Sequence, residues 1–452
     1  MRNYLVFILL LVQSCLGYSQ SFEGTWRGDL KIQGMALPLV FHLQGETKEW
    51  KGSMESPAQS KAQIPLSSVR VEQDSIFIEV AAIGLRFQGR LLDNEKLEGQ
   101  VLQNGMKLPI VMSRPENVSN KRLRPQTPTA PYPYDTLDVR FKNTFDAEEL
   151  AGTITMPRSE GKFPAVVLVT GSGPQDRNSE IFGHQIFKVV ADYLTRNNII
   201  VLRYDERGIG QSKGNYTTST INEFSKDVIS AVDFLKSQEK VDVNRVGIIG
   251  HSEGGLIATL IAGQHSADID FIGVLAGPAI SIDSLMVLQA YEIGKNAGMS
   301  ENYLEQVRNI NRKNYALVKS DLSAEHAYLQ ILENTEVIIP DPTQSQKDEI
   351  KMMMRPAYRY FMRIDPVPFI QQIKIPVYAA FGGKDIQVPF APNMESLSDN
   401  LPKNDRHLLK VYDGLNHLFQ KAETGAVSEY VEIEETFNEV VLSDLAGWIN
   451  SL

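Results

Sequence analysis

The chain has 452 residues, too many for one ordinary domain and enough for two. Hydrophobic residues make up 42% of it, so it can bury a sizeable core and is not composed like a disordered protein. The formal net charge is -10 and no long basic run occurs. Nucleic acid is therefore not an expected partner, because phosphate binding needs clustered Lys and Arg.

Residues 1–19 have the features of an export signal peptide. Arg2 supplies a positive charge, residues 5–12 are an unbroken apolar run, and Gly17-Tyr18-Ser19 provides small residues for cleavage. We expect an exported protein, periplasmic or extracellular. The apolar run is too short to span a bilayer, and no later stretch has the length and hydropathy of an integral membrane span. Cys15 leaves an alternative open, since residues 12–15 loosely resemble a lipoprotein signal that would anchor the chain through a lipid on Cys15.

Residues 20–115 predict a small all-β domain. Apolar side chains alternate with other residues in several short runs, such as Leu37, Leu39 and Phe41, which is the period of a half-buried strand. Turn residues separate these runs, and Asn104-Gly105 is the strongest hairpin signal among them. We expect about eight short strands in a small barrel or sandwich.

Residues 116–133 predict a Pro-rich linker, because closely spaced prolines prevent a helix or a central strand. From residue 134 to residue 452, continuous apolar strands alternate with amphipathic helices. This pattern predicts an α/β fold with a mostly parallel sheet and helices on both faces. The alternation stops at about residues 281–370, which are helical in character and rich in charge. Their position after the sixth strand predicts an inserted lid that covers the carboxyl end of the sheet.

The strongest chemical motif is Gly250-His251-Ser252-Glu253-Gly254, which directly follows an apolar strand and directly precedes a helical pattern. A G-x-S-x-G sequence in this context is typical of a nucleophile elbow. The turn holds the serine in a strained backbone conformation, and the flanking glycines let strand and helix approach closely. Ser252 is therefore the candidate nucleophile, and His251 is expected to point away from it.

A serine nucleophile needs a base and an acid. His417 lies in a glycine-containing loop after a late strand, where an imidazole with a pKa near neutrality can act as the base. Asp385 follows the strand at residues 377–381 and would fix the histidine tautomer. The chain order Ser252, Asp385, His417 is the order expected for such a fold. Asp413 remains as a competitor for the acid.

The remaining requirement is an oxyanion hole. Thr170-Gly171-Ser172-Gly173 follows an early strand, and its glycines allow backbone N–H groups to turn inward. We assign the N–H groups of Ser172 and Glu253 as the donors. A phosphate-binding loop is the rival interpretation, but the sequence lacks the Lys-Ser/Thr ending and the G-x-G-x-x-G spacing. A further stretch contains Asp205 and Arg207, which we expect to pin a loop near the site.

Together these residues resemble the α/β-hydrolase superfamily over residues 134–452. The loop at residues 171–177, the turn at 205–208 and the elbow at 250–255 look like those of secreted bacterial carboxylesterases with an extra N-terminal domain, and serine aminopeptidase-like hydrolases are similar too. The resemblance implies hydrolysis without a metal or cofactor. The sequence departs from many relatives at Thr170, where they have histidine.

The triad alone does not distinguish esters from peptides or thioesters, because the same machinery cleaves all three. We favour carboxylic ester cleavage, with a small-molecule ester as the substrate. A serine aminopeptidase and a thioesterase remain as alternatives. A binding protein on an inactive hydrolase scaffold predicts the loss of Ser252, Asp385 or His417, and none is lost. The oligomeric state stays open.

Overall fold

The computed structural model describes residues 22–32, 35–46, 49–56, 60–92, 95–103, 106–114, 124–265 and 267–452. The expected signal peptide with Cys15, the Asn104-Gly105 turn and the first half of the expected linker lie outside these residues. Within the described part of the chain, no helix combines the length and the hydropathy of a membrane span.

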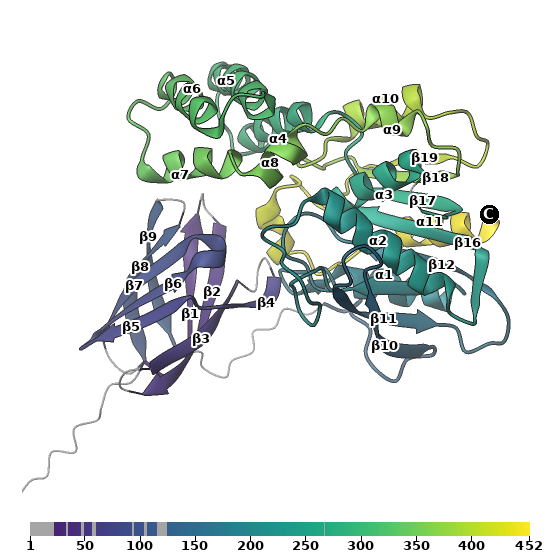
Figure 1. The fold of residues 1–452 in the computed structure, drawn as a ribbon, viewed down its shortest axis with the longest axis horizontal. Helices are drawn as coiled ribbons and strands as arrows, with labels where there is room; N and C mark the ends of the chain where they lie inside the picture. The colour runs from purple at the N-terminus through teal and green to yellow at the C-terminus, as the bar shows by residue number, and fades with distance from the viewer. Residues whose placement is uncertain are drawn as a thin grey trace, which may run out of the picture.

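The N-terminal residues form one curled antiparallel sheet, a half-barrel (Figure 1). Its order is β4-β3-β2-β1-β9-β8-β7-β6-β5, so nine strands are present where about eight were expected. Alternate side chains of each strand fill the interior, which is centred on the fully buried Trp26, Phe41 and Phe87. The strands are β1 (Gly24–Ile32), β2 (Met35–Glu46), β3 (Glu49–Ser56), β4 (Ser60–Pro65), β5 (Ser68–Glu72), β6 (Ser75–Val80), β7 (Leu85–Leu91), β8 (Lys96–Gln103) and β9 (Met106–Ser113), with a 3-10 turn η1 (Ala81–Ile83).

The second sheet has eight strands in the order β10-β11-β15-β12-β16-β17-β18-β19. Its six strands from β15 to β19 in this order are parallel, and β10 and β11 extend one edge antiparallel. The predicted mostly parallel sheet is therefore confirmed. The strands are β10 (Asp135–Lys142), β11 (Glu149–Met156), β12 (Phe163–Val169), β15 (Ile200–Tyr204), β16 (Val241–His251), β17 (Phe271–Leu275), β18 (Val377–Gly382) and β19 (Leu408–Tyr412), and β13 (Glu180–Ile181) pairs separately with β14 (His184–Gln185).

Helices cover both faces of this sheet, because its strands carry apolar side chains on both sides. Val201 and Ile249 pack with helices α1 (Ile186–Arg196) and α11 (Glu439–Ser451). The neighbouring residues Leu202 and Ile248 pack with the helices of the opposite face. The helices of that opposite face include α2 (Ile221–Lys236) and α3 (Glu253–Gln264). Later in the chain are α10 (Phe390–Asn400) and the 3-10 turn η2 (Val427–Val431).

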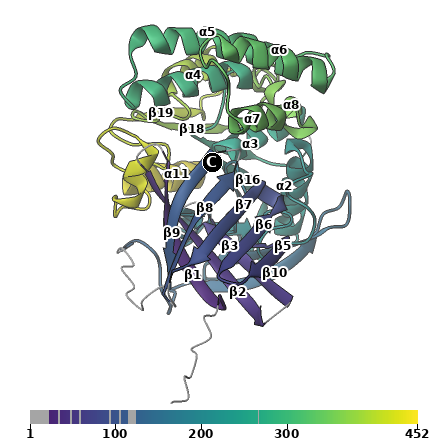
Figure 2. The ribbon, with the colours of Figure 1, turned by 90° about the vertical axis from the view of Figure 1, so that its left-hand side faces the viewer.

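The insertion between β17 and β18 is helical, as the sequence predicted. Figure 1 shows α4 to α8 gathered at one end of the molecule, and Figure 2 shows α5, α6 and α7 above the N-terminal sheet. Helix α7 contacts strand β9, so the insertion touches both parts of the chain. The helices are α4 (Ile282–Asn296), α5 (Glu301–Lys319), α6 (Ala324–Glu336), α7 (Gln344–Met353), α8 (Pro356–Met362) and α9 (Val367–Ile370).

The described part of the expected linker, residues 124–133, contains no helix or strand. It is hydrogen-bonded to the domain that contains the second sheet. Arg124 donates from Nη1 to the carbonyl of Ile433 at 2.6 Å and from Nη2 to that of Phe182 at 2.9 Å. Gln126 donates from Nε2 to the carbonyl of Phe437 at 2.7 Å. This part of the chain is therefore anchored by side chains, which its proline content alone did not predict.

Candidate active site

Ser252 lies in a sharp turn between β16 and α3. Its backbone has φ 54° and ψ -118°, a strained conformation for a residue with a side chain. Its N–H donates to the carbonyl of Leu275 on the neighbouring strand β17 at 2.8 Å. The turn therefore holds Ser252 at the carboxyl end of the parallel strands, where sheets of this kind place their active groups.

The glycines of the motif are required by close approach. A Cβ added to Gly250 would lie 2.0 Å from the carbonyl oxygen of Gly254, and one added to Gly254 would lie 2.1 Å from that of Val169. Both distances are far shorter than a van der Waals contact. No other residue type fits at either position without moving the backbone, which explains the spacing of the G-x-S-x-G motif.

Asp385 and His417 meet in the loops after β18 and β19. Asp385 Oδ2 lies 2.7 Å from His417 Nδ1, and each residue is only 5% exposed. The other oxygen, Oδ1, accepts the N–H groups of Gln387 at 2.8 Å and Val388 at 2.9 Å. An ionised carboxylate only accepts hydrogen bonds, so the proton is on His417 Nδ1 and the lone pair is on Nε2. This is the tautomer a general base needs.

The competitor for the acid, Asp413, is not placed for that role. It is exposed, and no hydrogen bond joins it to His417 within the described residues. Its backbone packs beside Gly383, in the loop that leads to Asp385. The geometry therefore favours Asp385.

The elbow and the histidine loop are joined by His251. Its Nε2 donates to the carbonyl of His417 at 2.8 Å, and the two rings are 4.7 Å apart between centroids. Burial and the neighbouring His417 lower the pKa of His251 to about 3, so it stays neutral. Ser252 Oγ makes no hydrogen bond to another described residue, and such bonds often tighten only when substrate binds. The sequence did not predict the contact of His251 with His417.

The loop after β12 lies against the elbow. A Cβ added to Gly171 would be 3.2 Å from the Cβ of Ser252, so the loop backbone passes directly beside the nucleophile. Ser172 is exposed, and its N–H has no acceptor among the described residues. Glu253 is the first residue of α3, where an N–H has no acceptor within the helix. Both assigned donors are thus available to a ligand.

Glu206 positions this loop, and the sequence did not single it out. Its Oε1 accepts the hydroxyl of Thr170 at 2.6 Å, and its Oε2 accepts the N–H of Gln175 at 3.0 Å. Burial raises the pKa of Glu206 well above its usual range. Thr170, which departs from the histidine of many relatives, therefore has a partner of its own in this chain.

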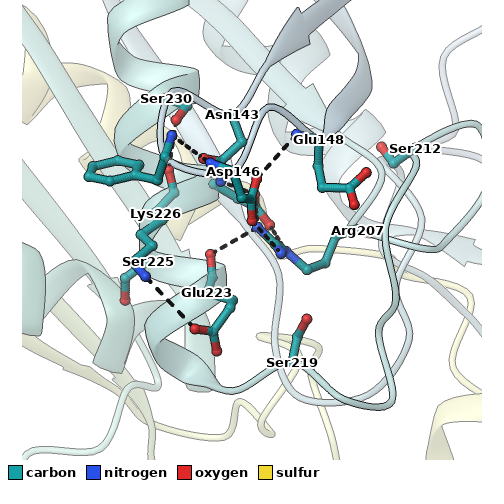
Figure 3. A network of polar contacts seen from close by, with 12 residues as sticks. Asn143, Asp146, Glu148, Arg207, Ser212, Ser219, Glu223, Ser225, Lys226 and Ser230 are labelled. Atoms are coloured by element: carbon teal, nitrogen blue, oxygen red, sulfur yellow. Dashed lines mark hydrogen bonds and ion pairs between the residues drawn. The ribbon is translucent and has the colours of Figure 1, made fainter.

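Asp205 and Arg207 pin the neighbouring loop, as expected. Asp205 Oδ2 pairs with Arg177 Nη2 at 2.7 Å. Arg207 pairs with buried Asp227 through two contacts of 2.6 Å. Arg207 also pairs with Asp146 at 3.0 Å (Figure 3). The pairs Arg177–Asp205 and Arg207–Asp227 are nearly closed to solvent, so removing one partner of either would leave a buried charge without compensation.

The buried carboxyl of Glu253 makes the stability of the folded protein depend on pH. Burial raises its pKa from 4.5 to about 7, so the folded state favours the protonated form. The free energy of unfolding therefore falls as the pH rises from the pKa of Glu253 in the unfolded chain, 4.5, through about 7. Glu253→Gln should unfold like the wild type near pH 5 and be more stable near pH 8.5, by about 1 to 3 kcal/mol. Thermal unfolding at both pH values measures this difference.

Glu333→Gln on the exposed face of α6 is the matched control, because it removes the same charge from an exposed position. It should show no comparable pH dependence. An equal effect of Glu253→Gln at both pH values would contradict the proposed cause.

No group of three or more His, Cys, Asp or Glu residues in the described part of the chain is arranged to hold a metal ion. The candidate site brings together a serine at an elbow, a buried Asp-His pair and two backbone donors. Fold and site together define the class as an α/β-hydrolase.

Comparison with known proteins gives the family. The model of the serine aminopeptidase S33 family matches residues 184–423, more than half of the chain, and this chain belongs to that family. The matched part contains Ser252, Asp385 and His417, whereas Ser172 precedes it. Membership makes the protein a serine hydrolase of the α/β class.

Several individual proteins are similar. Esterase EstD of Thermotoga maritima is 29% identical over 347 residues, which are 75% of each chain. Dipeptidyl-peptidase 5 of Porphyromonas gingivalis is 27% identical over 139 residues, covering 28% of this chain and 19% of that one. The solved esterase PF2001 of Pyrococcus furiosus matches 70% of this chain and 91% of its own, with a TM-score of 0.45 and 18% identity.

Proposed function

We propose that this protein hydrolyses carboxylic esters through an acyl-enzyme intermediate on Ser252, with His417 as general base and Asp385 as its acid partner. The observation that carries the proposal is the buried Asp385–His417 pair, which His251 holds against the strained elbow of Ser252. The three side chains follow the carboxyl ends of β16, β18 and β19, and only β17 separates β16 from β18 in the sheet. Their common position at this edge of the sheet supports the proposed triad.

In the proposed reaction, His417 Nε2 takes the Ser252 Oγ proton as Oγ bonds to the ester carbonyl carbon. The tetrahedral intermediate collapses, its carbon–oxygen bond to the alcohol breaks, and the alcohol leaves with the proton from His417. A water molecule then attacks the acyl carbon in the same way, with His417 again taking the proton, and the bond to Ser252 Oγ breaks to release the acid. Asp385 keeps the Nδ1–H tautomer and stabilises the imidazolium in both halves. The N–H groups of Ser172 and Glu253 stabilise the oxyanion, which develops only along the reaction path.

Ester cleavage is favoured over amide cleavage by one comparison and one structural feature. The similar Thermotoga protein is named an esterase. Helix α4 of the insertion also lies over the loops of the candidate triad: Gln289 Nε2 donates to the carbonyl of Gln387 at 3.2 Å, and Asn296 Nδ2 donates to that of Thr424 at 2.9 Å. A covered site favours compact substrates and excludes water.

Aminopeptidase activity is the second candidate, and Glu253 is the observation that favours it. Glu253 follows the nucleophile directly and is largely buried with part of its surface exposed, and its carboxyl makes no hydrogen bond within the described residues. It could hold the free amine of a substrate. Thioester cleavage has no separate support.

A comparison of substrates tests the choice. We expect kcat/KM for p-nitrophenyl acetate or butyrate to exceed that for aminoacyl p-nitroanilides by about a hundredfold or more, since esters are also intrinsically more labile. The measurement uses the full chain with matched leaving-group detection. Faster cleavage of any aminoacyl anilide than of the short esters would make the protein an aminopeptidase instead.

We also propose export of the protein with removal of residues 1–19, on the basis of the apolar run and the cleavage site. We propose three further segments in the chain: a β domain at 20–115, a linker at 116–133 and a hydrolase domain at 134–452. Attachment of a lipid to Cys15 is the alternative to removal of residues 1–19, and mass spectrometry of the exported chain distinguishes the two.

A further inference from the structure

Tyr430 is a buried tyrosine whose hydroxyl reaches the loop that carries the proposed acid. It lies in the 3-10 turn η2 and is only 1% exposed. Its hydroxyl accepts a hydrogen bond from Gln387 Nε2 at 2.8 Å. A buried tyrosine hydroxyl normally has a partner, and the partner here is a residue that also contacts Asp385.

Gln387 holds the loop after β18 with both its backbone and its side chain. Its N–H donates to Asp385 Oδ1 at 2.8 Å, and its carbonyl accepts from Gln289 Nε2 of the insertion at 3.2 Å. The other oxygen of Asp385 lies against His417. A shift of Gln387 would therefore turn the carboxylate relative to the imidazole. The bond to Tyr430 opposes such a shift from outside the loop.

Tyr430 is itself held on both its backbone and its ring. Its carbonyl accepts from His184 Nε2 at 2.9 Å, and His184 Nδ1 lies 2.9 Å from the Thr436 hydroxyl. Burial lowers the pKa of His184 to about 4, so the neutral ring can donate from one nitrogen and accept at the other. The Tyr430 ring packs edge-on against Phe182, with ring centroids 6.0 Å apart. The hydroxyl is therefore presented to Gln387 by a side chain that is fixed in place.

The residue before Tyr430 ties the same turn to the histidine loop. Glu429 Oε1 accepts the N–H of Thr424 at 2.7 Å, and its Oε2 accepts that of Gly425 at 3.2 Å. Both residues belong to the segment that follows His417. The turn η2 thus contacts the acid loop through Tyr430 and the histidine loop through Glu429.

Burial, and then the charge of the Asp385 carboxylate, raise the pKa of Tyr430, so its hydroxyl stays neutral. We infer that Tyr430 is a positioning residue for the proposed ester hydrolysis, which fixes Asp385 in line with His417 through its hydrogen bond to Gln387. The inference rests on the proposed function, because Tyr430 has this role only if Asp385 and His417 act on Ser252. Tyr430 acts through Gln387 and is not itself a catalytic residue.

Tyr430→Phe removes the hydroxyl and keeps the ring. We expect kcat for p-nitrophenyl butyrate to fall about tenfold, because a small misplacement of a catalytic group is costly, while KM stays within about twofold. Fluorophosphonate labelling of Ser252 should slow by a similar factor, since it also needs the aligned histidine. Gln387→Ala keeps the N–H to Asp385 but loses the bond to Tyr430, so it should show the same loss. The double variant should also lose about tenfold rather than about a hundredfold, since both changes break one hydrogen bond.

Tyr134→Phe is the matched control. Tyr134 is also buried, and its hydroxyl donates to Asp192 of α1 at 2.7 Å, outside the loops of the triad. It should keep kcat within about twofold of the wild type. Circular dichroism must first show that Tyr430→Phe folds; if it does not, Gln387→Ala at its partly buried position decides.

Four results would overturn the role of Tyr430: wild-type kcat in the folded variants, an equal loss in Tyr134→Phe, a rise in KM in place of the loss in kcat, or multiplied losses in the double variant. A wild type that is not labelled at Ser252 would overturn the proposed function and this role together. A labelled wild type with an unaffected Tyr430→Phe would overturn this role alone.

Discussion

Ser252→Ala should lower kcat for a short ester by about 10⁶-fold. The rate that remains should be the one that substrate binding and the oxyanion contacts provide without the nucleophile. The variant loses the oxygen that is proposed to form the acyl bond, whereas the elbow depends on the glycines and on the N–H of residue 252. The fold should therefore persist, with circular dichroism like that of the wild type. Steady-state kinetics with p-nitrophenyl butyrate measure the loss.

Ser172→Ala is the matched serine control. Its proposed role needs only the backbone N–H, and its side chain is exposed, so kcat should stay within about threefold of the wild type. A Ser252→Ala protein that is folded and keeps a tenth of the wild-type rate would remove Ser252 from the mechanism.

Asp385→Asn should lower kcat by about 10⁴-fold. The amide has almost the same size, but it can donate a hydrogen bond to His417 Nδ1 and so favours the tautomer with its proton on Nε2. That tautomer cannot take the Ser252 proton. Because Asp385 Oδ1 also accepts two backbone N–H groups, the variant should lose some stability, and activity must be compared at a temperature where it is folded.

Asp413→Asn is the control for this prediction, because Asp413 belongs to the loop that carries His417 but is exposed. It should change kcat by less than about threefold. The opposite ranking of the two variants would assign the acid to Asp413.

The elbow could be predicted because its requirements are local. Two glycines, a serine, a preceding apolar strand and a following helix lie within one short segment of sequence, and the close contacts at Gly250 and Gly254 confirm why they are needed. The alternation of strand and helix likewise depends on nearby side chains. The late positions of Asp385 and His417 followed from strand order, which is a property of the fold class.

The roles of His251 and Glu206 could not be predicted in this way. His251 contacts a carbonyl 166 residues later, and Glu206 holds a hydroxyl 36 residues earlier. Periodicity in the sequence gives no sign of such long-range polar pairs. The ninth strand was missed for a related reason, since β4 (Ser60–Pro65) has few apolar residues and its pairing with β3 depends on backbone hydrogen bonds.

Labelling of the intact protein with a fluorophosphonate, followed by mass spectrometry of its peptides, tests the proposed role of Ser252 most directly. This reagent forms a covalent bond with an activated serine and with few other groups. We expect one label per chain, on Ser252, and prior labelling should abolish ester hydrolysis. Asp385→Asn should be labelled far more slowly, because activation of the serine needs the correct histidine tautomer. A label on a different serine, or loss of activity on labelling without a label on Ser252, would contradict the role of Ser252 as nucleophile.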